Sequence, residues 1–419
     1  MTDPHPTADP ATLTARARDL DDADPLGAFV DEFVPSGEVV SYLDGNSLGR
    51  PLRALPDLVT AFIEKDWGSG LIRSWDAGWM QRPVALGDRL GRIALGATAG
   101  QVFIGDSTTV LLYKAVRAAV AARPERTEIV IDDDNFPTDR YIVEGIAAET
   151  GRTVRWIHAD PASGVTADQV REAVNDQTAA VLLSHVAYRS GWVADVPGIT
   201  DIIHSAGAIA IWDLCHSAGV IPTELDAWDV DLAVGCTYKY LNGGPGSPAF
   251  GYVRTELQSR LQQPIQGWMG TADVFEMGPS YRPALGIRRF VSGTPAIFAM
   301  LAMDAMLDLI ERAGIDAVYA KSIRLTDFAE QSLGVHVLPH GARLESPQRG
   351  AHRGSHLTVA HPAFRDLTPV LWEQGVIPDF RAPDGIRIGL SPLSTTFAEV
   401  DEGIRILAEE LARAAAAQK

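Results

Sequence analysis

Between Gln101 and Arg254 the sequence alternates short apolar runs with helix-like segments, and this alternation constrains the fold more than any other feature. The runs with the length and composition of buried strands are 102–104, 128–132, 153–158, 180–186, 208–213, 232–235 and 249–253. Apolar strands that are joined by helices form a mostly parallel sheet with both faces covered. The sequence therefore predicts an α/β fold with a mostly parallel seven-stranded sheet.

The intervening segments carry helix start and stop signals. A helix is predicted over Thr109–Ala122 with Ser107 or Thr108 as its cap, and another over Thr138–Thr150, closed by Gly151. From Thr294 apolar residues recur at helical spacing, and after about residue 330 short strands and helices indicate a smaller α+β domain. We expect an N-terminal arm over 1–45, a large domain over 46–310 and a small C-terminal domain over 311–419.

Size and charge narrow the class of protein. A chain of 419 residues that is 46% hydrophobic can bury a large core, and its net charge of -18 disfavours a nucleic-acid binder. No secretory signal or membrane-spanning segment is visible in the sequence, so a cytoplasmic protein is expected. Two cysteines, Cys215 and Cys236, make no disulfide framework and are interpreted as small buried side chains.

Lys239 and Asp213 together predict the chemistry. Lys239 lies in a run that becomes Gly-rich at Gly243, and Asp213 ends the apolar run 208–213. Pyridoxal phosphate enzymes need a lysine to bond the cofactor aldehyde and a carboxylate to keep the pyridine nitrogen protonated. The plainer alternative is a surface lysine beside a turn, but other polar residues at strand ends favour a cofactor site.

Those other residues follow the predicted strands. Thr108 and the neighbouring hydroxyls open a helix after the first strand, which suits a phosphate group. Phe136 could stack on a flat ring, and Ser184 and His216 lie where α/β sheets bind ligands. Tyr238 could contact the phosphate or carry a proton. Taken singly, each of these residues also fits a structural role as a helix cap, core side chain or loop contact.

Arg387 lies in an apolar strand of the small domain, within the run 385–389. A buried arginine needs a partner, and a substrate carboxylate held by two parallel hydrogen bonds would supply one. An internal salt bridge is the alternative explanation.

With these residues assembled, the chain closely resembles the kynureninase family, which are fold-type-I pyridoxal phosphate enzymes related to aspartate aminotransferase and the class V aminotransferases. The matching segments run from about residue 40 to residue 396 and are 42–49, 70–75, 135–139, 212–219, 238–246, 267–270 and 353–356, together with Arg387. The segments around Asp213 and Lys239 are the most specific.

The resemblance implies roles for individual residues. Lys239 would bond the cofactor and move the Cα proton, Asp213 would pair with the pyridine nitrogen, and Tyr238 would return a proton to Cβ. The cofactor contacts implied are Thr108, Thr109, Phe136, Asp139, Ser184, His216, Tyr238, Trp268 and Thr294, of which Trp268 and Thr294 would come from the second subunit of a homodimer. The substrate contacts implied are Arg387, Trp75 and Asn46, and no metal is expected.

The activity implied is hydrolysis of the Cβ–Cγ bond of L-kynurenine or 3-hydroxy-L-kynurenine, which yields L-alanine and anthranilate or 3-hydroxyanthranilate in tryptophan catabolism. The sequence departs from the family at Thr271, where His is usual, at Arg282, where Glu is frequent, and over 187–191. A ring-substituted kynurenine in a secondary pathway, or another class V aminotransferase-like reaction, is therefore the alternative.

Two rival functions remain. A cysteine desulfurase would need a reactive cysteine on a mobile loop in the second half of the chain, and no cysteine follows Cys236. A binding or regulatory module without catalysis would have no need of Lys239, Asp213 and Arg387 together. Both are therefore disfavoured.

Overall fold

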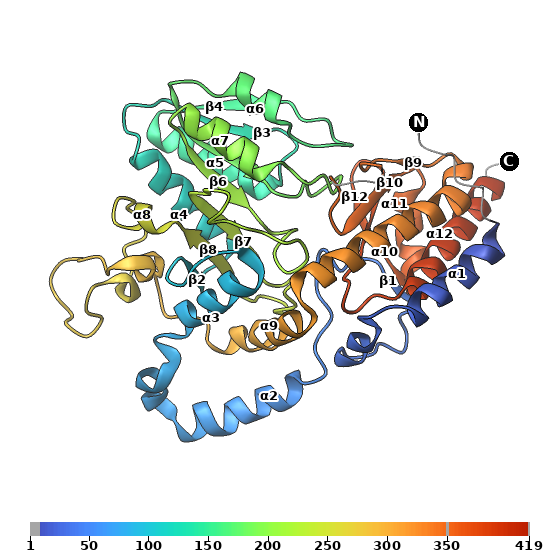
Figure 1. The fold of residues 1–419 in the computed structure, drawn as a ribbon, viewed down its shortest axis with the longest axis horizontal. Coiled ribbons are helices and arrows are strands. Elements are labelled where there is room, and N and C mark those ends of the chain that lie inside the picture. Colours follow the sequence, from blue (N-terminus) through green and yellow to red (C-terminus); the bar gives the residue numbers. More distant parts are fainter. Residues whose placement is uncertain (1–8, 349–351, 418–419) are drawn as a thin grey trace.

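The computed structural model describes residues 9–348 and 352–417, so the first eight residues of the expected arm lie outside the described part. The core is a seven-stranded sheet in the order β2-β8-β7-β6-β5-β3-β4 (Figure 1). Its strands are β2 (Val102–Gly105), β3 (Glu128–Asp132), β4 (Thr153–Ile157), β5 (Thr178–Ser184), β6 (Ile209–Asp213), β7 (Leu232–Gly235) and β8 (Ala249–Val253). Strand β8 runs antiparallel to β2 and β7 while all other pairs are parallel, which confirms the mostly parallel sheet.

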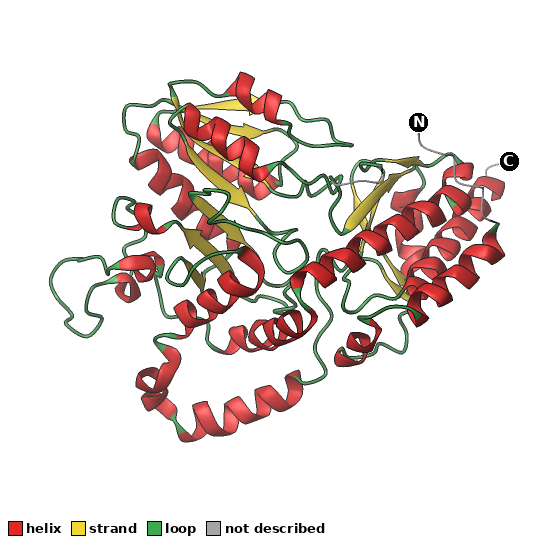
Figure 2. Ribbon diagram, in the orientation of Figure 1, coloured by secondary structure: helices red, strands yellow, loops and turns green. Residues whose placement is uncertain are grey.

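Helices cover both faces of this sheet (Figure 2). They are α3 (Arg82–Leu90), α4 (Thr108–Ala121), α5 (Pro137–Thr150), α6 (Ala167–Ala173), α7 (Val196–Ser205), α8 (Thr255–Gln258) and α9 (Leu301–Ala313). Alternate strand residues enter two different cores, so that Trp212 packs with α3, α7 and α9 whereas Ile211 packs with α4 and α5. Double coverage explains why the strands are continuous apolar runs rather than alternating ones.

The predicted signals at the helix ends are present. The Ser107 side chain caps α4 by accepting from the backbone N–H of Val110, and Gly151 ends α5 with a φ of 67°. A residue with a side chain would resist that left-handed conformation.

The C-terminal part forms a smaller α+β unit. Its antiparallel sheet has the order β12-β13-β10-β9, with β9 (Arg343–Leu344), β10 (His356–Ala360), β12 (Asp379–Arg381) and β13 (Gly385–Gly389). The helices are α10 (Ile315–His336), α11 (Phe364–Glu373) and α12 (Phe397–Ala417). Phe328, Ile388 and Ile404 meet in its core.

The N-terminal segment belongs spatially to this C-terminal unit. Helix α1 (Pro10–Asp22) packs against α10 and α12, and the short strand β1 (Ser41–Tyr42) pairs in parallel with β11 (Val376–Ile377) (Figure 1). A buried ion pair between Asp24 and Lys321 at 2.6 Å fixes the end of the segment on α10. The expected domain boundaries at residues 45 and 310 stay predictions.

Helix α2 (Leu55–Ala61) and the irregular helical turns that follow it extend away from both sheets (Figure 1). This segment and the loop between α8 and α9 carry large exposed apolar side chains, among them Ile72, Phe275, Met277 and Leu285. None of the helices that the structure describes is long and apolar enough to cross a bilayer.

Candidate active site

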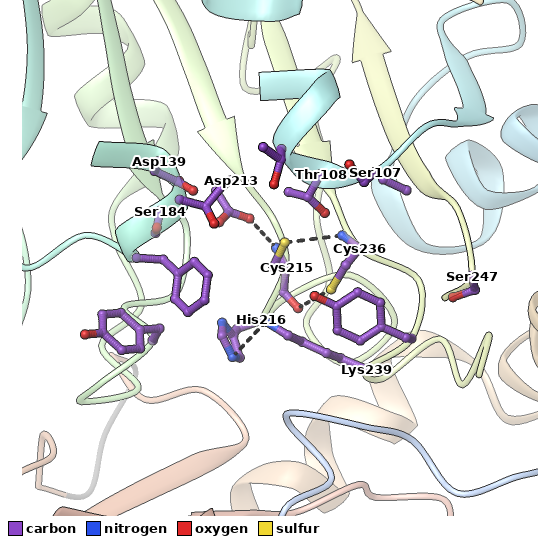
Figure 3. A pocket seen from close by; sticks show the side chains of 16 residues that line it. Ser107, Thr108, Asp139, Ser184, Asp213, Cys215, His216, Cys236, Lys239 and Ser247 are labelled. Atoms are coloured by element: carbon purple, nitrogen blue, oxygen red, sulfur yellow. Dashed lines mark hydrogen bonds between the residues drawn. The ribbon is translucent and has the colours of Figure 1, made fainter. Parts of the chain in front are cut away.

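A pocket opens at the carboxyl ends of β5 and β6, where the amino ends of α4 and α5 face the turn that follows β7 (Figure 3). Its empty volume is about 650 Å³ with the open mouth included. The side chains that line it are Ser107, Thr108, Thr109, Phe136, Thr138, Asp139, Ser184, Tyr188, Asp213, Cys215, His216, Cys236, Tyr238, Lys239, Ser247 and Ala249. The structure therefore brings together the predicted candidates that follow successive strands, as expected for the switch region of an α/β sheet.

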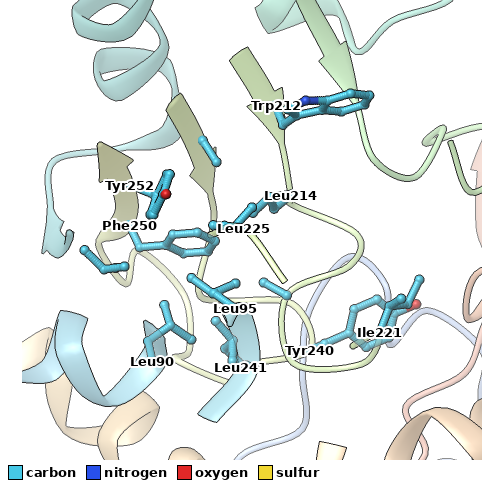
Figure 4. Packing of buried hydrophobic residues seen from close by; sticks show 14 of the residues in the cluster. Leu90, Leu95, Trp212, Leu214, Ile221, Leu225, Tyr240, Leu241, Phe250 and Tyr252 are labelled. Carbon is cyan, nitrogen blue, oxygen red and sulfur yellow. The ribbon is translucent and has the colours of Figure 1, made fainter. Parts of the chain in front are cut away.

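Lys239 points into this pocket from a tightly held turn. The backbone N–H of Gly243 donates to the carbonyl of Thr237 at 2.8 Å, and that of Asn242 donates to the carbonyl of Lys239 at 3.0 Å. Gly49 packs so closely on the turn that a Cβ atom there would lie 2.5 Å from the Lys239 carbonyl oxygen, so only glycine fits. Leu241 anchors the turn in the hydrophobic core, as Figure 4 shows.

Among the described residues, His216 provides the one polar side-chain contact that the amine of Lys239 makes at hydrogen-bond distance. Its Nζ lies 3.2 Å from Nε2 of His216 and 5.9 Å from the ring centre of Phe136. Burial and the charge of Lys239 lower the pKa of His216 well below its usual value, so this imidazole is neutral and Nε2 accepts from the amine. Lys239 is thus held by a neutral acceptor and has no carboxylate partner among the ion pairs of the described residues.

Two carboxyl groups, Asp213 and Asp139, share one buried region of the pocket (Figure 3). Asp213 ends β6, and its Oδ1 accepts from the backbone N–H of Cys215 at 2.6 Å. Both carboxyl oxygens of Asp139 are buried without a hydrogen-bond partner among the described residues. Burial and the charge of Asp213 raise the pKa of Asp139 well above its usual value, which favours the protonated form of Asp139, the form that can donate to Asp213.

The amino end of α4 provides groups for an anion. Ser107 is engaged as the helix cap, whereas the hydroxyl of Thr108 is buried without a partner among the described residues. Free backbone N–H groups and the helix dipole favour a phosphate at this position. The unpartnered Thr108 hydroxyl, the free amine of Lys239, the Asp213 carboxylate and the exposed face of Phe136 are together the groups that pyridoxal phosphate needs, so the residues present fit this cofactor.

Phe136 and Ser184 complete the pocket and are fixed by local contacts. The ring of Phe136 meets that of Tyr188 edge-on at 5.3 Å, which leaves a ring face toward the pocket. The hydroxyl of Ser184 donates to Oδ1 of Asn135 at 3.0 Å. Tyr188 and Asn135 were not among the predicted site residues, and the motif 135–139 was the only signal that could have suggested Asn135.

Five predicted residues do not line this pocket. Asn46 is fully buried beside Gly389, and its side-chain oxygen and nitrogen have no partner among the described residues. Trp75 packs edge-on against Trp79 with ring centres 5.4 Å apart. Trp268 is 44% exposed, and Thr294 is exposed as well.

The fifth, Arg387, forms the internal salt bridge that the sequence left open. Its guanidinium is 1% exposed, with Nε 2.7 Å and Nη2 2.5 Å from Oδ2 of Asp379. Nη1 donates to the carbonyl of Tyr188 at 2.8 Å, and Nη2 donates to Oγ of Ser47 at 2.9 Å. Asp379 was not predicted, since a single carboxylate at the start of the short strand β12 (Asp379–Arg381) has no sequence signal of its own.

Comparison with known proteins identifies the class. The family model described as Aminotransferase class-V matches residues 96–376, which is more than half of the chain. Among solved structures, a cysteine desulfurase from Thermococcus onnurineus superimposes with a TM-score of 0.76 at 16% identity, covering 94% of this chain and 98% of that one. The cystine C-S lyase C-DES in complex with cysteine persulfide gives a TM-score of 0.77 at 20% identity, covering 90% and 98%. At these identities the structural likeness concerns the fold.

Curated relatives narrow the class. A kynureninase from Pseudomonas fluorescens is 40% identical over 408 residues, which cover 95% of both chains. A kynureninase from Burkholderia pseudomallei strain 1106a is 40% identical over 400 residues, or 94% of both chains. The chain therefore belongs to the class V aminotransferase family and, within it, to the kynureninases, which depend on pyridoxal phosphate.

Proposed function

We propose that this enzyme hydrolyses the Cβ–Cγ bond of L-kynurenine or 3-hydroxy-L-kynurenine, with release of L-alanine and anthranilate or 3-hydroxyanthranilate. The single observation that carries the proposal is the pocket in which Lys239, Asp213 and the amino end of α4 converge, in a chain that is 40% identical to kynureninases over nearly its full length. Pyridoxal phosphate, when bound, withdraws electrons from the substrate amino acid and so weakens the bonds around Cα and Cβ.

The chain's own groups would hold the cofactor and move protons. Thr108 and Thr109 would bind the phosphate, Phe136 would stack on the ring, and Asp213 would accept the hydrogen bond of the ring nitrogen. Lys239 would bond the cofactor at rest and carry the Cα proton during turnover. The neutral imidazole of His216 would keep the Lys239 amine oriented without competing for its charge.

Tyr238 is proposed as the proton donor to Cβ. Burial and the neighbouring cysteine thiols raise the pKa of its phenol far above the usual value, so the hydroxyl stays protonated at neutral pH. It lines the same pocket as Lys239, with the lysine amine 6.0 Å from its ring centre. A protonated phenol at that position can give a proton without first having to collect one.

Arg387 is proposed to bind the substrate carboxylate, and its present contacts show what must move before it can do so. Four of its five N–H groups are already engaged, two by Asp379, one by the carbonyl of Tyr188 and one by Ser47. The remaining N–H group is on Nη1. Two parallel bonds to a substrate would require Asp379 to yield. Arg381 already donates to the same Asp379 oxygen at 2.7 Å and could retain the displaced carboxylate.

We further propose a homodimer with shared active sites. Trp268 and Thr294, which the family resemblance assigns to the neighbouring subunit's site, are exposed on the surface. The same surface carries Leu285 at 94% exposure and Met277 at 73% exposure, and an apolar area of this kind favours a protein interface. Two buried thiols without a disulfide are consistent with the cytoplasmic location that we also propose.

The activity is tested with purified protein, pyridoxal phosphate and a panel of L-kynurenine, 3-hydroxy-L-kynurenine and ring-substituted analogues, with the aromatic amine product as the readout. Release of anthranilate, lost in Lys239→Ala, is the expected result. Bound cofactor with no aromatic amine from any member of the panel would overturn the proposal. A preference for ring-substituted analogues would instead support the alternative that the departures at Thr271 and Arg282 suggest.

Subunit complementation tests the shared sites. Lys239→Ala and Trp268→Ala are each expected to be poorly active, but a hybrid dimer of the two would contain one site with both native residues. Equal mixing after reversible dissociation should restore about a quarter of native activity, because half of the dimers are hybrids and each has one intact site. No gain on mixing would mean that Trp268 serves the site of its own chain.

A further inference from the structure

The pocket contains two thiols that the proposed reaction does not use. Cys215 and Cys236 follow the adjacent parallel strands β6 and β7, two positions beyond the last register pair, Asp213 with Val234. The backbone N–H of Cys236 donates to Sγ of Cys215 at 3.2 Å, and Sγ of Cys236 donates to the carbonyl of Cys215 at 3.8 Å (Figure 3). The two residues therefore face each other across the sheet edge.

The two thiols contact each other and line a pocket that small molecules can enter. Each thiol interacts with the other, and both are 8% exposed or less. Both also line the pocket that contains Lys239, so a small reagent that enters the pocket reaches them directly. They are the only two cysteines in the sequence, so no other disulfide can form within one chain.

We propose that Cys215 and Cys236 are an oxidisable dithiol, which a hydroperoxide converts into an intramolecular disulfide at the floor of the cofactor pocket. Neighbouring strands lie about 4.8 Å apart, and disulfides join Cα atoms that are about 4.4–6.8 Å apart. Cys215 and Cys236 lie just beyond the ends of these two strands, and the 3.2 Å contact between the Cys236 nitrogen and the Cys215 sulfur keeps the two residues as close as the bond requires.

The reaction balances with hydrogen peroxide as the two-electron oxidant. The Cys236 thiolate attacks one peroxide oxygen, the O–O bond breaks, and a sulfenic acid forms while the departing hydroxide takes up the proton that the Cys236 thiol had released and leaves as water. The sulfur of Cys215 then displaces the hydroxyl of the sulfenic acid, which leaves as a second water when it takes the thiol proton. Burial opposes ionisation of Cys236, but the hydrogen bond from Cys215 and the charge of Lys239 leave its pKa lowered, which suits it to the first step.

Closure of the disulfide would disturb both cofactor anchors. The backbone N–H of Cys215 holds Oδ1 of Asp213, and Cys236 lies three residues before Lys239 in the same turn. A disulfide of about 2.05 Å would pull the two sulfur atoms together. It would break the hydrogen bonds that each sulfur atom now makes with the backbone of the other cysteine. The closed form is therefore expected to bind pyridoxal phosphate more weakly and to lose activity, and reduction of the bond is expected to restore both.

The test treats the cofactor-loaded enzyme with hydrogen peroxide and follows thiols, linkage and activity in parallel. Free thiols, titrated after denaturation, should fall from two per chain to none. Cleavage after Glu224, which lies between the two cysteines, should leave the two peptides joined until dithiothreitol is added. Activity and the visible absorbance of bound cofactor should fall together with the thiols and return with dithiothreitol. Added pyridoxal phosphate should slow closure, because the cofactor and the oxidant share the pocket.

Cys215→Ala and Cys236→Ser are the comparison variants, and each is measured relative to its own untreated activity. Neither can close the disulfide, so neither should show inactivation that dithiothreitol reverses. Loss of native activity without joined peptides, separate oxidation of the two thiols to sulfinic acids, or linkage between two chains would overturn the proposal. A disulfide that forms without any change in activity or cofactor absorbance would overturn its functional part. Thiol counts and peptide linkage do not depend on the substrate, so this test can fail independently of the proposed function.

Discussion

Asparagine in place of Asp139 should leave turnover nearly intact, whereas the same change at Asp213 should remove most of it. The two carboxyl groups share a buried region, and burial together with the charge of Asp213 raises the pKa of Asp139 well above its usual value. A protonated Asp139 is neutral and donates to Asp213. An asparagine is neutral as well and can donate from its NH2 group, so Asp139→Asn preserves both the charge and the contact.

The expected losses in kcat/KM of the two variants differ by more than a factor of ten at their upper limits. Asp213→Asn removes a hydrogen bond to a charged group, which contributes about 1.5–3 kcal/mol and corresponds to a loss of about 10- to 150-fold in kcat/KM. Asp139→Asn exchanges one neutral donor for another, so the loss should stay below about threefold.

The pH dependence of the free energy of unfolding tests the proton on Asp139 independently. Because the pKa of Asp139 is raised on folding, the native state holds a proton that the unfolded chain has already released, and stability falls as pH rises from the usual carboxyl pKa toward the raised one. The slope is about 1.4 kcal/mol per pH unit. Asp139→Asn has no proton to lose, so it should unfold at higher denaturant than the native protein at neutral pH, and this advantage should vanish in acid.

Steady-state kinetics at saturating cofactor and urea unfolding at several pH values measure these effects. Asp168→Asn is the matched control, since the Asp168 side chain is 85% exposed and should change neither property. If Asp139→Asn lost as much activity as Asp213→Asn, or if its stability ran parallel to that of the native protein across pH, Asp139 would be ionised and the reasoning would be refuted.

Three further predictions concern other residues. Tyr238→Phe should lower kcat about a hundredfold or more while cofactor affinity holds, because a positioned acid contributes at least that much; unchanged kcat would exclude Tyr238 as the donor. Asp379→Asn should lower KM about tenfold with a smaller change in kcat, since it removes the carboxylate that the substrate must displace from the buried guanidinium of Arg387, and an unaltered KM would separate that guanidinium from the substrate site. Lys321→Met should lower the free energy of unfolding by about 3–5 kcal/mol, because it removes the close partner of the buried Asp24 carboxylate and leaves only Arg324, at 3.9 Å. The exposed ion pair between Arg312 and Glu32 should contribute less than about 1 kcal/mol to the free energy of unfolding in the same urea assay. Equal losses on breaking the two ion pairs would contradict the burial argument.

Local patterns were sufficient to predict the large sheet. Strand 208–213 and its neighbours are apolar on both faces, and a sequence of that kind has few alternatives to a doubly covered parallel sheet. The order of the strands places Asp213, Ser184 and the Lys239 turn at one edge, so these residues could be predicted to meet without knowledge of their contacts.

Contacts between distant segments could not be predicted in the same way. The protonation of Asp139, in helix α5, depends on Asp213 at the end of strand β6, and the engagement of Arg387 depends on Asp379 and on Ser47 from the N-terminal segment. Each of these contacts is a property of three-dimensional packing, and no spacing within one segment encodes it. The same holds for the facing thiols Cys215 and Cys236, which the sequence presented as two unrelated small residues.

The packing of α1 on α12 has a consequence for biosynthesis. The hydroxyl of Thr14 donates to a carboxylate oxygen of Asp401 at 2.8 Å, across a sequence separation of 387 residues. A ribosome that adds roughly 5–20 residues per second needs roughly 20–80 s to make that stretch. For most of this time the apolar side of α1, with Leu13 at its centre, has no partner to cover it, because α10 and α12 are both made late. Release of the finished chain, rather than emergence of the large sheet, is therefore the earliest moment at which the C-terminal unit can close, and the nascent N-terminal helix is the segment most in need of a chaperone until then.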